Sequence, residues 1–106
     1  MIAHHYLEHC GYQVLERNYR FGKRGEIDII ARDGDYLVFC EVKSRETDEF
    51  GPPEYALTIH KQRQIRKIAH AYLYLRKIKD QACRFDVVAI RFEGTRPVLR
   101  LLKNAF

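Results

Sequence analysis

The residues best suited to chemistry lie in one stretch, GEIDIIARDGDYLVFCEVKSR, between positions 25 and 45. Two largely apolar runs in this stretch are separated by RDGD, a sequence typical of a tight β-hairpin turn. The ends away from the turn are charged: Glu26 and Asp28 lie on the first run, and Glu41 and Lys43 on the second. Crowded carboxylates repel one another, and a divalent cation relieves that repulsion.

The length of the turn decides whether the two sets of acids meet. Side chains alternate across a strand, so a two-residue loop places Asp28 and Glu41 on the same face. With Asp33-Gly34 as the loop the two acids are diagonal neighbours, and with Gly34-Asp35 they are directly opposite. Either register separates their backbone positions by roughly 5 to 8 Å. A three-residue loop would put them on opposite faces.

This set of residues has a catalytic and a structural interpretation. Oxygen ligands suit Mg²⁺ or Mn²⁺ rather than zinc, and the ammonium of Lys43 can orient a water or stabilise charge on a scissile phosphate. Metal-assisted phosphodiester hydrolysis needs little more. The alternative is a group of solvated cross-strand charges. The other face of the hairpin is apolar throughout, which indicates a central position in the sheet, where unpaired charges are costly to desolvate.

The elements that position these residues follow from periodicity and turn signals. We expect a single mixed α/β domain over residues 1–106 with the order α-β-β-β-α-β-β. The helices are predicted over 2–11 and 55–79, the loop before the second helix over 44–54, and the strands over 12–20, 26–31, 36–43, 84–92 and 97–103.

The second helix carries an apolar stripe and a basic surface. The stripe comprises Leu57, Ile65, Ile68, Ala69, Tyr72 and Leu75. Lys61 falls in the same stripe, where it either extends to solvent or borders the charged end of the sheet and contacts a phosphate. The basic residues off the stripe, which include Arg63, Arg66 and Lys67, form either a solvated face or a surface that follows a nucleic-acid backbone.

The composition agrees with a nucleic-acid partner without requiring one. The 106 residues carry a net charge of +5, which favours an anionic partner. The three cysteines have no metal-ligand spacing, and we expect reduced thiols in a cytoplasmic protein. No apolar run approaches transmembrane length and no signal peptide is evident, so a membrane role is not expected.

Several segments together resemble a known family. They are RNYRFGKRGEIDIIARDGDYLVFCEVKSR, FGPPEYAL, the lysine at 61, AHAYL, RFDVVAI and the closing NAF. They are similar to the YraN-like family of small bacterial proteins, predicted endonucleases that resemble archaeal Holliday-junction resolvases of the PD-(D/E)xK nuclease superfamily. The resemblance spans nearly the whole chain. It implies a restriction-endonuclease-like αβββαβ core with a mixed central sheet.

The resemblance also implies roles for individual residues. Asp28 matches the first carboxylate of the motif, although Ile27 stands where the motif has proline. Glu41 matches the second carboxylate and Lys43 the lysine, and the backbone carbonyl of Val42 is a further candidate metal ligand. Three other residues also match family positions. Glu26 would lie beside the metal ligands, and Lys61 lies on the helix that faces the site in related nucleases. The third is Arg45, at the end of the second run.

The first helix departs from the family pattern. Members carry a glutamate three residues before the alanine that matches Ala3, and that position would precede Met1. This glutamate is similar to an additional metal-site carboxylate in related resolvases. We therefore expect the first helix to be truncated at its N-terminus. Glu8 is a poor substitute because it lies on a different turn.

Three functions are compatible with these observations. The first is a Mg²⁺- or Mn²⁺-dependent endonuclease acting on DNA, including branched DNA. The second is a catalytically inactive nucleic-acid-binding module with the same fold, and the third is a protein-interaction subunit. A homodimer is a further expectation, because a symmetric junction requires two sites.

Overall fold

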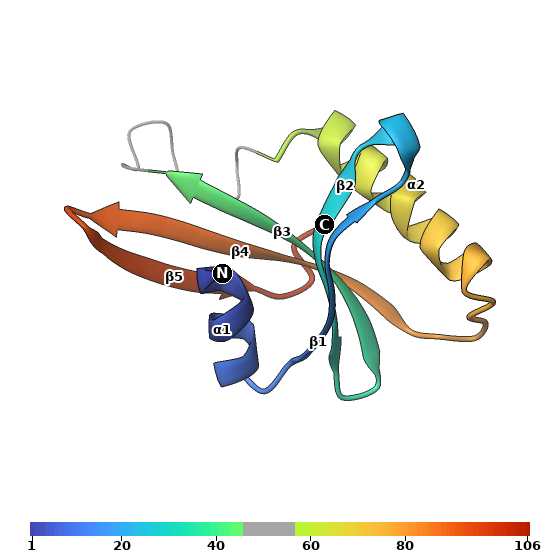
Figure 1. The fold of residues 1–106 in the computed structure, drawn as a ribbon, viewed down its shortest axis with the longest axis horizontal. Helices are drawn as coiled ribbons and strands as arrows, with labels where there is room; N and C mark the ends of the chain where they lie inside the picture. The colour runs from blue at the N-terminus through green and yellow to red at the C-terminus, as the bar shows by residue number, and fades with distance from the viewer. Residues whose placement is uncertain (46–56) are drawn as a thin grey trace.

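The computed structural model describes residues 1–45 and 57–106 (Figure 1). The fold is α/β with a mixed sheet and the order α-β-β-β-α-β-β, as the sequence predicts, and its first six elements are compatible with a restriction-endonuclease-like core. The elements are α1 (Ile2–His9), β1 (Gln13–Arg20), the 3-10 helix η1 (Gly22–Arg24), β2 (Glu26–Asp33), β3 (Tyr36–Arg45), α2 (Ile59–Leu75), β4 (Cys83–Glu93) and β5 (Arg96–Leu102).

The five strands form one sheet in the order β1-β2-β3-β4-β5. All neighbouring strands are antiparallel except β3 and β4, which are parallel. Parallel neighbours need a long crossover connection, and α2 lies in the connection between β3 and β4. The crossover therefore carries α2 over the strands that bear the charged residues.

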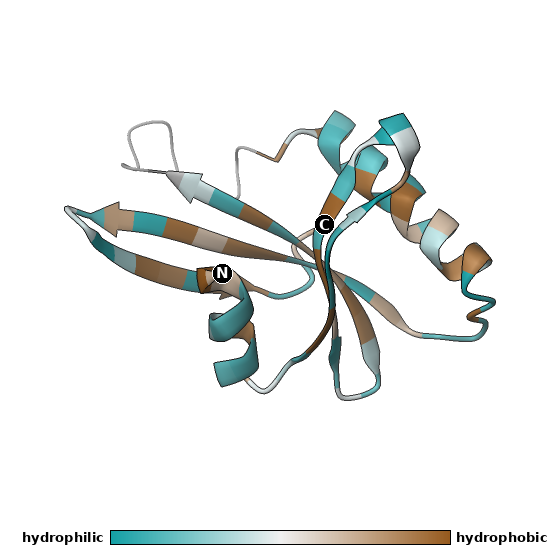
Figure 2. Ribbon diagram, in the orientation of Figure 1, coloured by the Kyte–Doolittle hydropathy of each residue, from teal (hydrophilic) through white to brown (hydrophobic). Residues whose placement is uncertain are grey.

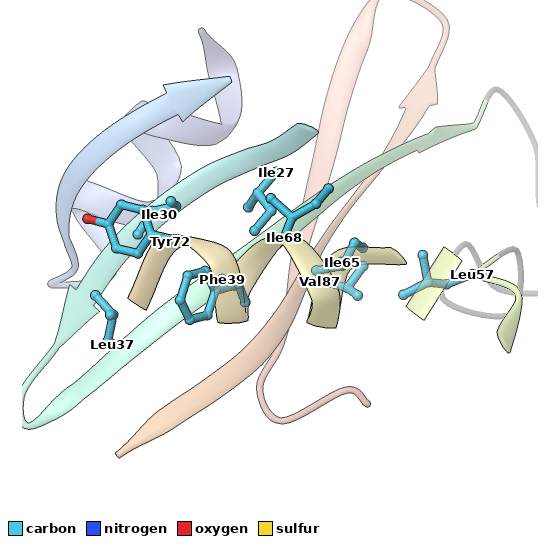
Figure 3. Packing of buried hydrophobic residues seen from close by; sticks show 10 residues of the cluster. Ile27, Ile30, Leu37, Phe39, Leu57, Ile65, Ile68, Tyr72 and Val87 are labelled. Atoms are coloured by element: carbon cyan, nitrogen blue, oxygen red, sulfur yellow. The ribbon is translucent and has the colours of Figure 1, made fainter. Parts of the chain in front are cut away.

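Each face of the sheet has its own hydrophobic core, because the middle parts of the central strands are continuously hydrophobic (Figure 2) and successive side chains point to opposite faces. The core under α2 includes Phe39 and Val87 of the sheet and Ile68 of the helix (Figure 3). The core under α1 includes Leu7 of the helix and Val88 of the sheet. Burial of both faces makes β2, β3 and β4 the central part of the molecule.

The helix α2 is shorter than the sequence pattern predicted. Thr58 begins it as N-cap, with its Oγ1 accepting the backbone N–H of Lys61 at 3.1 Å. Lys77, two residues beyond the helix, has a left-handed φ of 56°. Leu75 is 57% exposed, so its place in the apolar stripe was wrong, and the last fully buried residue of the helix is Tyr72. Neither helix of the described ranges is long and apolar enough to cross a membrane.

The hairpin between β2 and β3 adopts one of the two predicted registers. Asp33 pairs with Tyr36, so Gly34 and Asp35 form the loop. Gly34 has φ 58°, a conformation that glycine adopts without steric cost. This register places Asp28 and Glu41 in line with each other.

A buried polar network fixes β4 to its surroundings. The carboxylate of Asp86 is fully buried. It accepts hydrogen bonds from Arg84 at 2.9 Å, from the Tyr12 hydroxyl at 2.7 Å and from the backbone N–H of Asn104 at 2.9 Å. These hydrogen bonds join β4 to the segment before β1 and to the C-terminal residues, so Asp86 has a structural role.

Candidate functional site

The strands β2 and β3 separate where the acids lie. Their pairing ends at Ile29 and Cys40. Beyond this point β2 continues beside β1, and β3 continues beside β4 as far as Arg45. Figure 1 shows the two strands diverging, with β2 running toward α2. Asp28 and Glu41 are the first residues past the last pair, so they face each other across the opening.

The side chain of Asp28 closes this opening in place of the backbone ladder. Its Oδ2 accepts the backbone N–H of Val42 at 2.8 Å. The N–H and C=O of one strand residue point to the same side of the strand, so the carbonyl of Val42 is also directed toward Asp28. Two kinds of oxygen, carboxylate and carbonyl, thus converge on the fork between the strands.

The carboxyl group of Glu41 lies in an unusual environment. The residue is 5% exposed, and its buried Oε2 has no hydrogen-bond partner within the described ranges. Burial raises the pKa of Glu41 to about 7, and the negative charge of Asp28 and a hydrogen bond between the two carboxyl groups act in the same direction. An unpaired buried acceptor destabilises the folded state. A cation between the two acids would satisfy this oxygen and remove the repulsion.

Two lysines from different elements surround Glu41. Lys61, in the first turn of α2, and Lys43, two residues further along β3, both lower the pKa of Glu41. Both lysines are half-buried. Of the two interpretations of Lys61, the structure therefore favours the one in which it borders the charged end of the sheet. Its contact with a phosphate remains a prediction.

The oxygen atoms present fit a hard divalent cation. Asp28, Glu41 and the carbonyl of Val42 form an all-oxygen set of the type that Mg²⁺ and Mn²⁺ prefer. Within residues 1–45 and 57–106, no group of three or more His, Cys, Asp or Glu side chains is arranged around one metal position. This is compatible with Mg²⁺, which commonly uses one or two carboxylates and takes its other ligands from water and substrate phosphate.

The remaining predicted residues of the hairpin lie at its ends. Glu26 begins β2 and contacts Arg20 of β1 at 3.5 Å between Oε2 and a guanidinium nitrogen. Arg45 ends β3, where its backbone is in register with Arg91 of β4. The described contacts of Glu26 thus direct it to β1, while its place beside the metal ligands remains a prediction.

The predicted basic face of α2 is divided between two flanks. The guanidinium of Arg66 lies over Phe85 and Phe106, at 4.8 and 5.5 Å from the ring centroids. Arg63 and Lys67 lie on the flank toward η1, around a hollow that also involves Arg24 and His60.

Sequence reasoning did not identify Arg24 and His60 as part of a site. The only sequence signal for Arg24 is its position in the basic segment GKRG. Its proximity to His60 depends on how η1 packs against α2, and no local pattern encodes that packing.

Comparisons with known proteins assign a family to this fold and site. The model of a family described as "Uncharacterised protein family UPF0102" matches residues 1–90. Relatives named "UPF0102 protein" occur in Geobacter metallireducens (48% identity, covering 99% of this chain and 85% of the relative), Syntrophus aciditrophicus (48%, covering 99% and 82%) and Lachnoclostridium phytofermentans (50%, covering 98% and 85%). None of these names states an activity.

Proposed function

The chain belongs to the UPF0102 family, as its resemblance to YraN-like proteins predicted, and we propose that it is a divalent-metal-dependent endonuclease that hydrolyses phosphodiester bonds in DNA. One observation carries the proposal: the buried Oε2 of Glu41 lies beside a second carboxylate and has no hydrogen-bond partner among residues 1–45 and 57–106. A buried acceptor without a partner destabilises the folded state, and a cation bound between the two carboxylates would satisfy it.

The proposed cation is Mg²⁺ or Mn²⁺, held by Asp28, Glu41 and the carbonyl of Val42. When bound, it supplies a Lewis acid for the phosphoryl oxygen and lowers the pKa of a coordinated water. The Val42 N–H holds the Asp28 carboxylate in place at 2.8 Å. The burial of Glu41 limits competition from bulk water for the same oxygens.

The two lysines act on the reacting groups in this proposal. Lys43 orients the attacking water, whose oxygen bonds to phosphorus as one phosphorus–oxygen ester bond breaks and the departing oxygen gains a proton. Lys61 pairs with a non-bridging oxygen of the same phosphate and stabilises the charge that develops there. The ammonium groups of Lys43 and Lys61 approach from β3 and from α2, so they can contact different sides of one phosphate group.

The choice of nucleic acid as substrate rests on charge and on the family resemblance. The net charge of +5 favours a polyanion, and Arg63, Lys67, Arg66 and Arg45 are proposed to contact its backbone. DNA, including branched DNA, is the class of substrate that the resemblance implies. A symmetric junction has two equivalent strands to cut, so the proposal includes a cytoplasmic homodimer.

A second candidate function is a nucleic-acid-binding module that keeps the fold without cleaving its ligand. It is favoured by the observation that only two acidic side chains meet at the fork within the described ranges. This alternative predicts salt-dependent binding that is indifferent to divalent cations. The two functions therefore differ in the effect of metal.

The test is cleavage of a labelled four-way junction and a linear duplex of the same sequence with Mn²⁺. The proteins are the wild type, Glu41→Gln, and Lys79→Ala as a charge control from beyond the end of α2. We expect wild-type cleavage, a loss of at least about 100-fold in Glu41→Gln, and no loss in the control. Equal cleavage by Glu41→Gln would contradict the site, and metal-independent binding without cleavage would support the binding module.

A further inference from the structure

A basic hollow of about 390 Å³ lies between η1 and the first turns of α2. It is lined by Arg24, His60, Arg63, Gln64 and Lys67. Three of these side chains carry a positive charge at neutral pH, and none of the five is acidic. The hollow is separate from the carboxylates of the fork, because neither Asp28 nor Glu41 is among its lining residues.

The backbone fixes the shape of this hollow. Four of the lining residues come from α2, and each lies three or four residues from another, which gathers them on one side of the helix. They are His60, Arg63, Gln64 and Lys67. The side-chain amide of Gln64 donates a hydrogen bond to the backbone carbonyl of Arg24 and so fastens η1 to α2.

Gly25 permits this close approach. It has φ 117°, and a Cβ built on it would lie 2.5 Å from the amide nitrogen of Gln64. A larger residue at this position would be strained at this φ and would displace the Gln64 amide from the Arg24 carbonyl. The arrangement of the basic side chains therefore depends on a local packing contact between the two elements.

The cations of the hollow lack acidic partners among the described residues. Arg20, Arg76, Arg84 and Arg96 each form an ion pair with a described carboxylate. No such pair with a described acid occurs for the three cations of the hollow, which are Arg24, Arg63 and Lys67. Like charges gathered around one concavity repel one another, so an anion placed in it would stabilise the arrangement.

We propose that the hollow binds a backbone phosphate of DNA other than the phosphate that is cleaved. The choice of DNA rests on the proposed function, whereas the preference for a phosphate rests on the hollow itself. Lys61, which acts on Glu41, is the residue after His60, so α2 contributes to both sites. Phosphates follow one another about every 3.4 Å along the axis of each strand, so one bound segment supplies phosphates to both positions.

The test measures binding of a labelled duplex in EDTA over a range of salt concentrations, where no cleavage occurs. The variant Arg24→Ala/Lys67→Ala is compared with Arg17→Ala/Lys79→Ala, which removes the same residue types outside the hollow. We expect the first variant to bind about tenfold more weakly and to reduce the slope of log K against log salt by about 1. Equal affinity and slope in both variants would overturn the inference.

A competition experiment with inorganic phosphate shows whether the hollow binds a phosphate of the DNA backbone or free phosphate. If the hollow serves DNA, phosphate at millimolar concentration should weaken duplex binding by the wild type more than by Arg24→Ala/Lys67→Ala. If phosphate shifts the amide resonances of Arg24 and Lys67 while duplex binding is the same in both variants, the hollow binds free phosphate and the assignment to DNA is overturned.

The same proteins separate this inference from the proposed nuclease activity. Absence of cleavage with Mn²⁺, together with weaker binding by the hollow variant, would refute the nuclease and support the hollow. Cleavage that requires Glu41, together with unchanged binding by the hollow variant, would support the nuclease and refute the hollow.

Discussion

The Oδ2 of Asp28 accepts the backbone N–H of Val42 at 2.8 Å, at the point where the pairing of β2 and β3 has ended. The side chain thus replaces a bond that the ladder would otherwise have made. A residue proposed to hold a metal ion therefore also contributes to the stability of the sheet. Substitutions that differ in hydrogen bonding and in charge separate these two roles.

We predict that Asp28→Asn and Asp28→Ala differ in stability but not in cleavage. Asparagine keeps an acceptor for the Val42 N–H, whereas alanine leaves this donor unpaired and should lower the free energy of unfolding by about 1–2 kcal/mol. Both variants lose the charge and should lose cleavage. Urea unfolding in EDTA and a cleavage assay measure the two effects, and equal destabilisation by both variants would contradict the structural role.

A second prediction concerns the pH dependence of stability without metal. The pKa of Glu41 is about 7 in the folded protein against an ordinary value of 4.5. Between these values the folded state binds more protons than the unfolded state, so the free energy of unfolding should decrease as pH rises from about 4.5 through 7. The contribution is about 3 kcal/mol, and Glu41→Gln should lack it.

The informative quantity is the difference between the wild type and Glu41→Gln, because other groups titrate in both proteins. We expect Glu41→Gln to be the more stable protein at pH 8 in EDTA and to lose that advantage at pH 5. Asp80→Asn serves as a control from an exposed position. Unfolding curves whose difference does not change with pH would refute the environment assigned to Glu41.

Divalent cations should reverse this order of stability. A ligand that binds only the folded state stabilises it by about 2.7 kcal/mol at 100 times its Kd. Mn²⁺ should therefore raise the Tm of the wild type and raise it more at pH 8 than at pH 6, because the ion competes with the proton on Glu41. Thermal unfolding in Mn²⁺ and in EDTA checks this, and an equal increase in Glu41→Gln would place the ion elsewhere.

The sequence limited the ways in which Asp28 and Glu41 could meet. Period-two alternation and the turn signal allowed two registers that bring them together and a three-residue loop that separates them, and the structure adopts the register in which they face each other. Both signals are local, since they depend on strand geometry and on glycine at a left-handed position. The burial of Glu41 was less evident, because it depends on where α2 lies.

Features that depend on packing were not predictable in the same way. Strict alternation assigned Ile27 to the face of Ile29, whereas Ile27 packs in the core under α2. The reason is that β2 leaves β3 after Ile29 and turns toward the helix. The apolar stripe of α2 was likewise extended to Leu75, which is exposed because the buried residues of the helix end at Tyr72.

The last prediction tests whether Asp86 acts outside the site. Its carboxylate is fully buried and is hydrogen-bonded by Tyr12, Arg84 and the Asn104 backbone. Asp86→Ala leaves the guanidinium of Arg84 with Asp33 as its remaining acidic partner and should lower the free energy of unfolding by about 3–5 kcal/mol. Tyr12→Phe removes one hydrogen bond and should lower it by about 1–2 kcal/mol.

Cleavage distinguishes this network from the proposed site. Tyr12→Phe should cleave DNA at the wild-type rate per folded molecule, because no contact joins its hydroxyl to Asp28 or Glu41 among the described residues. The measurement combines cleavage at a temperature below both unfolding transitions with circular dichroism of the same samples. A Tyr12→Phe protein that is fully folded but cleaves at least tenfold more slowly would show that the network under α1 also positions the carboxylates of the proposed site.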